Sequence, residues 1–219
     1  MKVGTDGVLL GAWASLDKQP ESILDIGAGT GLIALQLAQR SYAETIDAIE
    51  LDDAAYEQCV ANFEASPWGD RLFCYHAGFD EFVDEMEDTY DLIVSNPPFY
   101  AEDVASGNPF RDKARQSNSL PFDELVQGVS KFLTEDGIFA VIIPFKEEKS
   151  FVGLAEHVGM FPNRITRVKG NPDTDFKRSL MEFSFHQNEP IIDTLIIEEG
   201  RHQYTKEYVE LTQAFYLKM

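Results

Sequence analysis

Short apolar runs alternate with longer amphipathic segments along most of this chain. An apolar run of about four to eight residues is typical of a buried strand, and apolar positions repeated every three or four residues are typical of a helix that covers a sheet. The pattern predicts strands at Ile23–Ile26, Thr45–Ile49, Leu72–His76, Tyr90–Ser95 and Ile138–Ile143. It predicts helices at Leu32–Ala38, Asp53–Ala65 and Phe122–Leu133.

The alternation of strand-like and helix-like segments stops towards the end of the chain. Arg164–Val168 and Leu180–Phe185 are strand-like with no helix-length segment between them, which predicts an antiparallel hairpin at the sheet edge. Leu195–Ile197 is expected to add a short strand and Lys206–Leu217 a final helix. Strands that alternate with helices indicate a parallel sheet covered on both faces. We therefore expect an α/β fold with a doubly wound, mainly parallel, Rossmann-like sheet and an antiparallel C-terminal hairpin.

Length and composition suggest one globular domain, since the chain has 219 residues of which 44% are hydrophobic. Within it we expect an N-terminal block (1–14), an alternating core (20–160) and a last part (161–219) with the hairpin, a short strand and the C-terminal helix. No stretch approaches the ~20 apolar residues of a membrane helix, and the first residues carry no apolar signal segment. Cys59 and Cys74 form no CxxC pair, and the four His residues are scattered. These features predict a cytoplasmic monomer with no metal and no membrane partner.

The charge is strongly acidic but unevenly distributed. The net charge is −20, and 15 acidic residues but only one basic residue lie between Glu44 and Asp91. A uniformly acidic surface would repel a phosphate backbone. However, 8 of the 18 Lys and Arg residues fall into two short windows, which are Arg111, Lys113 and Arg115, and Arg164, Arg167, Lys169, Lys177 and Arg178. Two basic windows keep a nucleic-acid partner open, although each single residue is also compatible with an ordinary solvated position.

Glycines follow the first predicted strand, at the point where it turns into the first helix. The segment Asp25-Ile26-Gly27-Ala28-Gly29-Thr30-Gly31 has the spacing GxGxG, and an acid precedes the first glycine by two positions. Glycines there let the backbone turn tightly and let a ligand approach closely. A nicotinamide loop has the spacing GxGxxG, so a nicotinamide oxidoreductase is disfavoured. The pattern resembles the first motif of class I methyltransferases, in which the acid and the loop hold the amino-acid end of S-adenosylmethionine.

A carboxylate ends the second predicted strand. Glu50 lies 19 residues after Gly31, and a carboxylate at that edge can accept hydrogen bonds from both hydroxyls of a ribose. Many class I methyltransferases also place an acid after the third strand, against the adenine amine of the cofactor. Here Gly78 stands at that position, and Asp80, two residues on, is the candidate to replace the acid.

Asn96-Pro97-Pro98-Phe99 is the strongest motif in the chain and directly follows the fourth predicted strand. Two prolines fix the backbone there, so the side-chain oxygen of Asn96 and the carbonyl of Pro97 can point at one spot. An amine conjugated with a ring is a poor nucleophile, because its lone pair is delocalised. Two acceptors that form hydrogen bonds with its two hydrogens favour a pyramidal nitrogen, whose lone pair can attack. Phe99 can stack on the flat face of such a substrate.

This tetrapeptide resembles that of the amino methyltransferases. These enzymes act on adenine N6, cytosine N4, guanine N2 or the glutamine amide of release factors, and the tetrapeptide does not choose among them. It could also be a strand-ending turn without chemistry, but the glycine loop and Glu50 precede it in the expected order.

The two ends of the chain resemble one family more closely. The block from Met1 to Ala14, the segment from Asn62 to Trp68 and the block from Tyr204 to Leu217 are similar to bacterial tRNA1(Val) adenine N6-methyltransferases. The resemblance spans essentially the whole chain. It implies S-adenosylmethionine as cofactor, tRNA as partner and adenine 37, beside the anticodon, as the methylated base. Family members usually carry further residues before this block. We therefore expect either that the start codon has been assigned too late or that this member is shortened.

The resemblance and the motifs together define the expected site. The catalytic residues are Asn96, Pro97 and Phe99. The cofactor-binding residues are Thr5, Asp6, Gly7, Asp25, Gly27, Gly29, Gly31, Glu50 and Asp80. The tRNA-binding residues are Pro98, Tyr100, Arg111, Lys113, Arg115, Lys177 and Arg178.

Other functions stay open beside this one. A release-factor glutamine N5-methyltransferase shares the tetrapeptide, but it normally carries a separate N-terminal helical domain, whereas Asp25 here already lies in the first strand. An rRNA guanine N2-methyltransferase is a further alternative. A non-catalytic RNA-binding protein with the cofactor fold would be expected to lose Asn96 or the glycines, and both are present.

Overall fold

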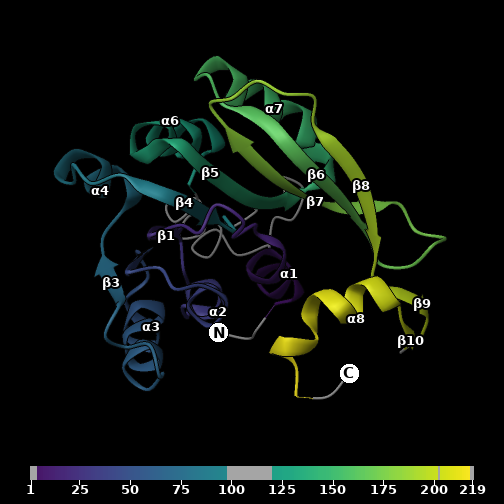
Figure 1. Ribbon diagram of the computed structural model, residues 1–219, viewed down its shortest axis with the longest axis horizontal. Coiled ribbons are helices and arrows are strands. Elements are labelled where there is room, and N and C mark those ends of the chain that lie inside the picture. Colours follow the sequence, from purple (N-terminus) through teal and green to yellow (C-terminus); the bar gives the residue numbers. More distant parts are fainter. Residues whose placement is uncertain (1–3, 98–119, 202, 218–219) are drawn as a thin grey trace, which may run out of the picture.

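A computed structural model describes residues 4–97, 120–201 and 203–217 of the chain. Its centre is an eight-stranded sheet with helices on both faces (Figure 1). The strands are β1 (Ser22–Ile26), β2 (Thr45–Glu50), β3 (Leu72–His76), β4 (Tyr90–Ser95), β5 (Leu133–Pro144), β6 (Phe161–Lys169), β7 (Phe176–Ser184) and β8 (Ile191–Ile196). The helices are α1 (Thr5–Trp13), α2 (Leu32–Arg40), α3 (Asp53–Glu64), α4 (Phe79–Glu85), α6 (Phe122–Phe132), α7 (Glu148–His157) and α8 (Lys206–Thr212).

Strand order confirms the predicted fold class and corrects one detail. The order is β3-β2-β1-β4-β5-β7-β6-β8, and β1 to β5 are parallel to their neighbours within this series. β7 is antiparallel to both β5 and β6, as the hairpin prediction requires. The hairpin was predicted at the sheet edge, and that placement is wrong: β7 inserts between β5 and β6, while β8 runs parallel to β6 and forms the edge. A two-stranded antiparallel sheet of β9 (Glu198–Gly200) and β10 (Gln203–Tyr204) lies apart.

Two apolar cores fill the spaces above and below the sheet. On one face, residues such as Leu9, Leu37, Phe63 and Tyr208 join α1, α2, α3 and α8 to the strands. On the other face, α4, α6 and α7 pack against the strands. The central strands are buried on both sides and therefore read as nearly continuous apolar runs in the sequence. Within the described ranges, no helix is long and apolar enough to cross a membrane.

Helix α1 was not predicted as a helix, and its burial explains why. Every residue from Gly7 to Trp13 is buried, so the segment lacks the polar stripe by which a surface helix is recognised. Its glycines permit a close approach to α2: a Cβ on Gly11 would lie 2.3 Å from Oε1 of Gln36. The Gln36 side chain also donates from Nε2 to the carbonyl of Val8, at 3.2 Å.

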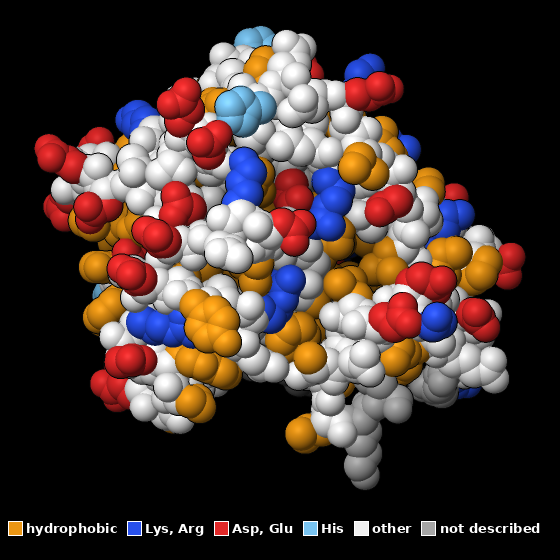
Figure 2. All heavy atoms as spheres, viewed as in Figure 1, with side chains coloured by type: hydrophobic (Ala, Val, Ile, Leu, Met, Phe, Trp, Pro, Cys, Tyr) orange, Lys and Arg blue, Asp and Glu red, His pale blue; other side chains and the backbone are white. Residues whose placement is uncertain are grey.

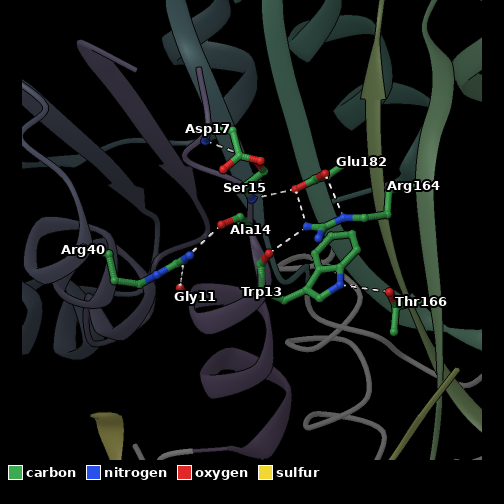
Figure 3. A network of polar contacts seen from close by, with 9 residues as sticks. All are labelled: Gly11, Trp13, Ala14, Ser15, Asp17, Arg40, Arg164, Thr166 and Glu182. Atoms are coloured by element: carbon green, nitrogen blue, oxygen red, sulfur yellow. Dashed lines mark hydrogen bonds and ion pairs between the residues drawn. The ribbon is translucent and has the colours of Figure 1, made fainter. Parts of the chain in front are cut away.

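Arginines hold the C-terminal end of α1 (Figure 3). Arg164, on β6, lies 3.8 Å from the Trp13 ring centroid, donates to the Trp13 carbonyl and forms a two-bond ion pair with Glu182 on β7. Glu182 in turn accepts from the backbone N–H of Ser15 at 2.7 Å. From the other side, Arg40 donates to the carbonyls of Gly11 and Ala14. Cations at carbonyls that lack helical partners stabilise the end of a helix, so α1 is fixed between α2 and the antiparallel strands.

Charge on the surface is as uneven as the sequence indicates. Figure 2 shows Asp and Glu side chains crowding the side formed by β3, α3 and α4, whereas several Lys and Arg side chains lie nearer the middle of this face. Two arginines of the second basic window serve the fold, since Arg164 pairs with Glu182 and Arg167 pairs with Glu148. The surface available to phosphates is therefore smaller than the count of basic residues indicates.

Candidate functional site

Most of the predicted site residues within the described ranges meet at one edge of the sheet. Because β1, β2, β3 and β4 are parallel, their carboxyl ends lie side by side. These ends lead into the glycine loop, Glu50, Gly78 and Asn96 respectively. In open parallel sheets this edge is where ligands bind.

The glycine loop is built by backbone conformations that favour glycine. Gly27, Gly29 and Gly31 all have positive φ values, of 72°, 59° and 77°. A Cβ on Gly31 would also lie 2.4 Å from Cε1 of Phe63, so α3 supports the loop from behind. The Asn62 side chain adds a hydrogen bond to the carbonyl of Thr30 at 2.9 Å. The loop is therefore preformed, and its shape depends on the absence of side chains.

Glu50 connects the end of β2 to this loop. Its Oε2 accepts from the N–H of Gly29 at 2.7 Å, and its Oε1 accepts from the N–H of Asp52 at 2.8 Å. The side chain is half-buried. Each carboxylate oxygen can accept more than one hydrogen bond, so acceptor capacity remains for hydroxyl groups of a ligand beside the loop.

Asp25 is fully buried beneath the glycine loop. Its Oδ2 accepts from the N–H of Ala34 in α2 at 3.1 Å, while Oδ1 has no hydrogen-bond partner. Burial is the main cause that raises the pKa of Asp25 to about 7; the hydrogen bond from Ala34 opposes this rise and the nearby Glu50 charge adds to it. A buried acceptor without a partner is costly unless a ligand supplies a donor, so Asp25 fits a cationic or N–H-bearing group at the loop.

This raised pKa leads to a stability prediction. Between the ordinary carboxyl pKa and about 7, the folded protein binds a proton at Asp25 that the unfolded chain does not bind. The stability that this proton contributes is fully present below the ordinary pKa. It is lost progressively as the pH rises from that value through about 7. We expect the free energy of unfolding of the parent to fall, relative to Asp25→Asn, by up to about 1.4 kcal/mol per pH unit in this window. Denaturant unfolding at pH 5, 6, 7 and 8 measures it, and parallel curves for the two proteins would contradict the assignment.

Asn96 follows Ser95, the residue of β4 that pairs with Ile26 just before the glycine loop, and lies close to the first turn of α1. It follows β4, is half-buried and precedes the buried Pro97. A Cβ on Gly7 would lie 3.3 Å from Cδ2 of Leu32 and 3.9 Å from Nδ2 of Asn96. The first turn of α1 thus packs against the start of α2 and the Asn96 amide. A side chain at Gly7 would press on Leu32 and touch the Asn96 amide.

Two residues assigned to different ligands are paired with each other in the structure. Asp6, expected at the cofactor, accepts through Oδ2 from Nε of Arg178, expected at the tRNA, with a distance of 2.7 Å. Both side chains are about two-thirds buried, at 28% and 33% exposure. The pair ties the first turn of α1 to the start of β7. Thr5 and Lys177, beside them in the sequence, are exposed.

The region after β3 places Asp80 beside Gly78. A Cβ on Gly78 would lie 2.6 Å from Oδ1 of Asp80, and Gly78 donates its N–H to Glu81. Leu51, which was not among the predicted site residues, follows Glu50 and keeps 50% of its surface exposed. Its carbonyl accepts a hydrogen bond from Nε2 of His76, at 3.2 Å, and the His76 ring stacks on Tyr56. The only sign in the sequence was an apolar residue directly after the strand-ending acid.

Several predicted site residues lie outside the described ranges, namely Pro98, Phe99, Tyr100, Arg111, Lys113 and Arg115. In the rest of the chain, no group of three or more His, Cys, Asp or Glu side chains is arranged to hold a metal ion.

Comparison with known proteins defines the class of this fold and site. Residues 8–164 match the family model of the Methyltransferase small domain, so the chain belongs to that class. Solved structures agree on the fold: a "predicted O-methyltransferase" from Agrobacterium tumefaciens superimposes with a TM-score of 0.72 at 18% identity, covering 95% of this chain and 96% of its own. A ribosomal protein L11 methylase from Lactobacillus delbrueckii gives 0.58 at 14% identity, covering 82% and 78%.

Sequence relatives then identify the particular family. A protein of Flavobacterium johnsoniae named tRNA1(Val) (adenine(37)-N6)-methyltransferase is 62% identical over all of this chain and 94% of its own length. Proteins of the same name from Bacteroides fragilis and Pectobacterium carotovorum are 42% and 40% identical over all of this chain, and over 92% and 88% of their own lengths. The chain belongs to the family of these tRNA1(Val) adenine N6-methyltransferases.

Proposed function

We propose that this protein transfers a methyl group from S-adenosylmethionine to N6 of an adenine in tRNA, and that this adenine is position 37 of tRNA1(Val). The observation that carries the proposal is the placement of Asn96 at the end of β4, next to the glycine loop on β1 and against Gly7 of α1. Family membership supports the substrate. No finding favours a release-factor, guanine N2 or non-catalytic alternative. A cytoplasmic monomer remains our expectation.

The residues present fit S-adenosylmethionine. Asp25 offers a buried acceptor without a partner beneath the loop, suited to the ammonium of the methionine end. Glu50 offers a carboxylate to the ribose hydroxyls, and the exposed Leu51 offers an apolar surface to the flat adenine. Asp80 is the proposed partner of the adenine amine, while Thr5, Asp6 and Gly7 border the methionine end. When bound, the cofactor supplies a methyl group activated by a sulfonium.

The chemistry at the acceptor is proposed to rest on hydrogen-bond acceptance. The Asn96 side-chain oxygen and the Pro97 carbonyl would accept the two hydrogens of the adenine amine and orient its lone pair. An amide does not titrate near neutral pH, so Asn96 takes up no proton. The proton leaves the nitrogen after transfer, because the methylated ammonium on an adenine is strongly acidic. Phe99 is proposed to stack on the target base.

The simplest test uses tRNA from cells that lack this activity. Incubation with the protein and S-adenosylmethionine is expected to produce N6-methyladenosine, detected by mass spectrometry of the nucleosides. A tRNA1(Val) transcript with adenine 37 replaced by guanine is the control, and it should receive no methyl group. Methylation of that control at another base would contradict the assigned position. Transfer to a release factor instead of tRNA would contradict the substrate.

Local electrostatics are expected to govern tRNA binding despite the net charge of −20. Arg111→Ala combined with Arg115→Ala should weaken binding and flatten the dependence on salt by about 1.5 units of slope, because each lost phosphate contact removes about 0.7 to 0.9. Cofactor affinity should not change.

A matched control removes two lysines from the opposite edge of the sheet. Lys18 donates to the carbonyl of Asp136 at the start of β5, and Lys131 lies in the last turn of α6, which leads into the same strand. Lys18→Ala with Lys131→Ala changes the net charge equally and should leave the slope as in the parent. Equal slopes for both double variants in a filter-binding titration would place the tRNA contacts elsewhere.

A further inference from the structure

An aromatic pair lies on the far side of the catalytic strand from the glycine loop. Phe145 directly follows β5 and Phe176 opens β7; their ring centroids are 5.1 Å apart, with planes inclined by 47°. Sheet order places β4, with Asn96 at its end, between β1 and β5. The cofactor loop and the aromatic pair therefore flank Asn96 from opposite directions along the same edge.

A cation lies over each ring of this pair. The Arg167 guanidinium lies 5.7 Å from the Phe145 centroid, and Nζ of Lys169 lies 5.0 Å from the Phe176 centroid. Glu148 holds Arg167 in place through hydrogen bonds to Nε and Nη2, the shortest 2.7 Å. Both phenylalanine side chains are only half-buried, although most large apolar side chains of the neighbouring strands are fully buried. We name these four residues, Phe145, Phe176, Arg167 and Lys169, the aromatic platform.

Further charges surround the platform. Lys146 and Lys177 are exposed immediately after Phe145 and Phe176, and Lys146 is paired with Glu147 at 3.6 Å. Asp173 and Asp175 are exposed in the turn that precedes Phe176. A phosphate is therefore expected beside Lys177 and not beside that turn. Flat rings bounded by cations match an unpaired nucleotide better than an apolar peptide, because a base stacks on rings while its phosphate needs positive charge.

We propose that the aromatic platform binds an unpaired nucleotide that flanks the target adenine in the RNA, with its base stacked on Phe176 beside Phe145. This rests on the proposed function, and it adds a second base-binding position on the side of Asn96 away from the cofactor. In single-stranded loops, unstacked bases can be splayed out and stacked on aromatic side chains, so a neighbour of the target base can occupy such a position. The platform thereby selects RNA loops over paired stems.

Paired substitutions at Phe176 test this. Phe176→Leu keeps apolar volume but removes the flat ring, and Phe176→Tyr keeps the ring. The Leu variant is expected to raise the KM for tRNA about tenfold, within a range of about 5- to 150-fold, since base stacking on an aromatic ring contributes about that much. The Tyr variant should stay within about twofold of the parent. Cofactor affinity and Tm should be close to parental in both. Tyr42→Leu is the control, since Tyr42 is fully exposed between α2 and β2, at the opposite edge.

A second measurement needs only the parent protein. A stem-loop RNA with 2-aminopurine on one or the other side of the target adenine should lose fluorescence at one of these positions on binding, as its base stacks. An unchanged KM in Phe176→Leu, equal effects of Leu and Tyr, or unquenched 2-aminopurine at both positions would each overturn the platform. Failure of the parent to methylate any tRNA would instead overturn the proposed function, while the fluorescence measurement would still test the platform.

Discussion

Asn96→Ala is expected to lower the single-turnover rate of methyl transfer to tRNA by about 10²–10³-fold while cofactor affinity stays near the parental value. Removal of one positioned hydrogen-bonding group from a catalytic site typically has an effect of that size. The amide lies at the end of β4 against the first turn of α1, where a Cβ on Gly7 would come within 3.9 Å of its nitrogen. The lower rate should therefore arise because the acceptor amine is no longer positioned and activated, while the glycine loop stays intact.

Asn96→Asp separates hydrogen-bond acceptance from other roles of this residue. A carboxylate retains acceptors at the same place, so partial activity is expected beside near-zero activity in the Ala variant. The pH–rate profile of the parent should show no ionisation that belongs to position 96, because an amide takes up no proton. An added ionisation in the profile of Asn96→Asp would then belong to the new carboxylate. Parental rates in Asn96→Ala would show that the tetrapeptide is only a turn.

Glu50→Ala is expected to weaken S-adenosylmethionine binding by at least about a hundredfold. The carboxylate accepts from the Gly29 and Asp52 backbone N–H groups in the structure, and it is proposed to accept both ribose hydroxyls. Hydrogen bonds to a charged group contribute about 1.5–3 kcal/mol each, and about 1.4 kcal/mol corresponds to a tenfold change in affinity. Loss of the ribose bonds and of the support for Gly29 act in the same direction.

Calorimetric titration with S-adenosylmethionine measures this effect. Glu57→Ala is the matched control, because Glu57 is an exposed acid on the adjacent helix α3 and its removal changes the net charge equally. Glu50→Gln, which keeps one acceptor oxygen, should fall between the parent and Glu50→Ala. Equal affinities of the Glu50→Ala and Glu57→Ala variants would show that Glu50 does not contribute to cofactor binding.

The sequence was sufficient for the parallel half of the fold. β1 to β4 and the helices α2, α3 and α6 appear within a few residues of their predicted bounds, since their burial leaves a direct record in the apolar pattern. β5 begins at Leu133, earlier than the predicted Ile138, because its first residues include exposed polar positions. α4, which has only seven residues, and α7 were not predicted, and neither was α1, which is buried on nearly every side.

Local motifs also located the glycine loop, Glu50 and Asn96, because each lies at the end of a recognisable strand. The pairing of Asp6 with Arg178 could not be predicted in this way. The two residues are 172 positions apart, and each had been assigned to a different ligand from its own surroundings in the sequence. The same holds for Arg164 and Arg167, whose partners Glu182 and Glu148 become visible only once the antiparallel strands are assembled.

Helix α1 precedes the large sheet in the sequence, yet some of its partners lie far along the chain. Trp13 bonds to Thr166, 153 positions later, and Ser15 bonds to Glu182, 167 positions later. Contacts of such high contact order form late in folding, because a long loop must close before they are gained. On a ribosome, the C-terminal end of α1 can therefore be fixed only after β7 has emerged. The contacts of Gly7 with Leu32 and Asn96 involve residues made earlier, so a nascent chain can place the first turn of α1 before it can fix the last.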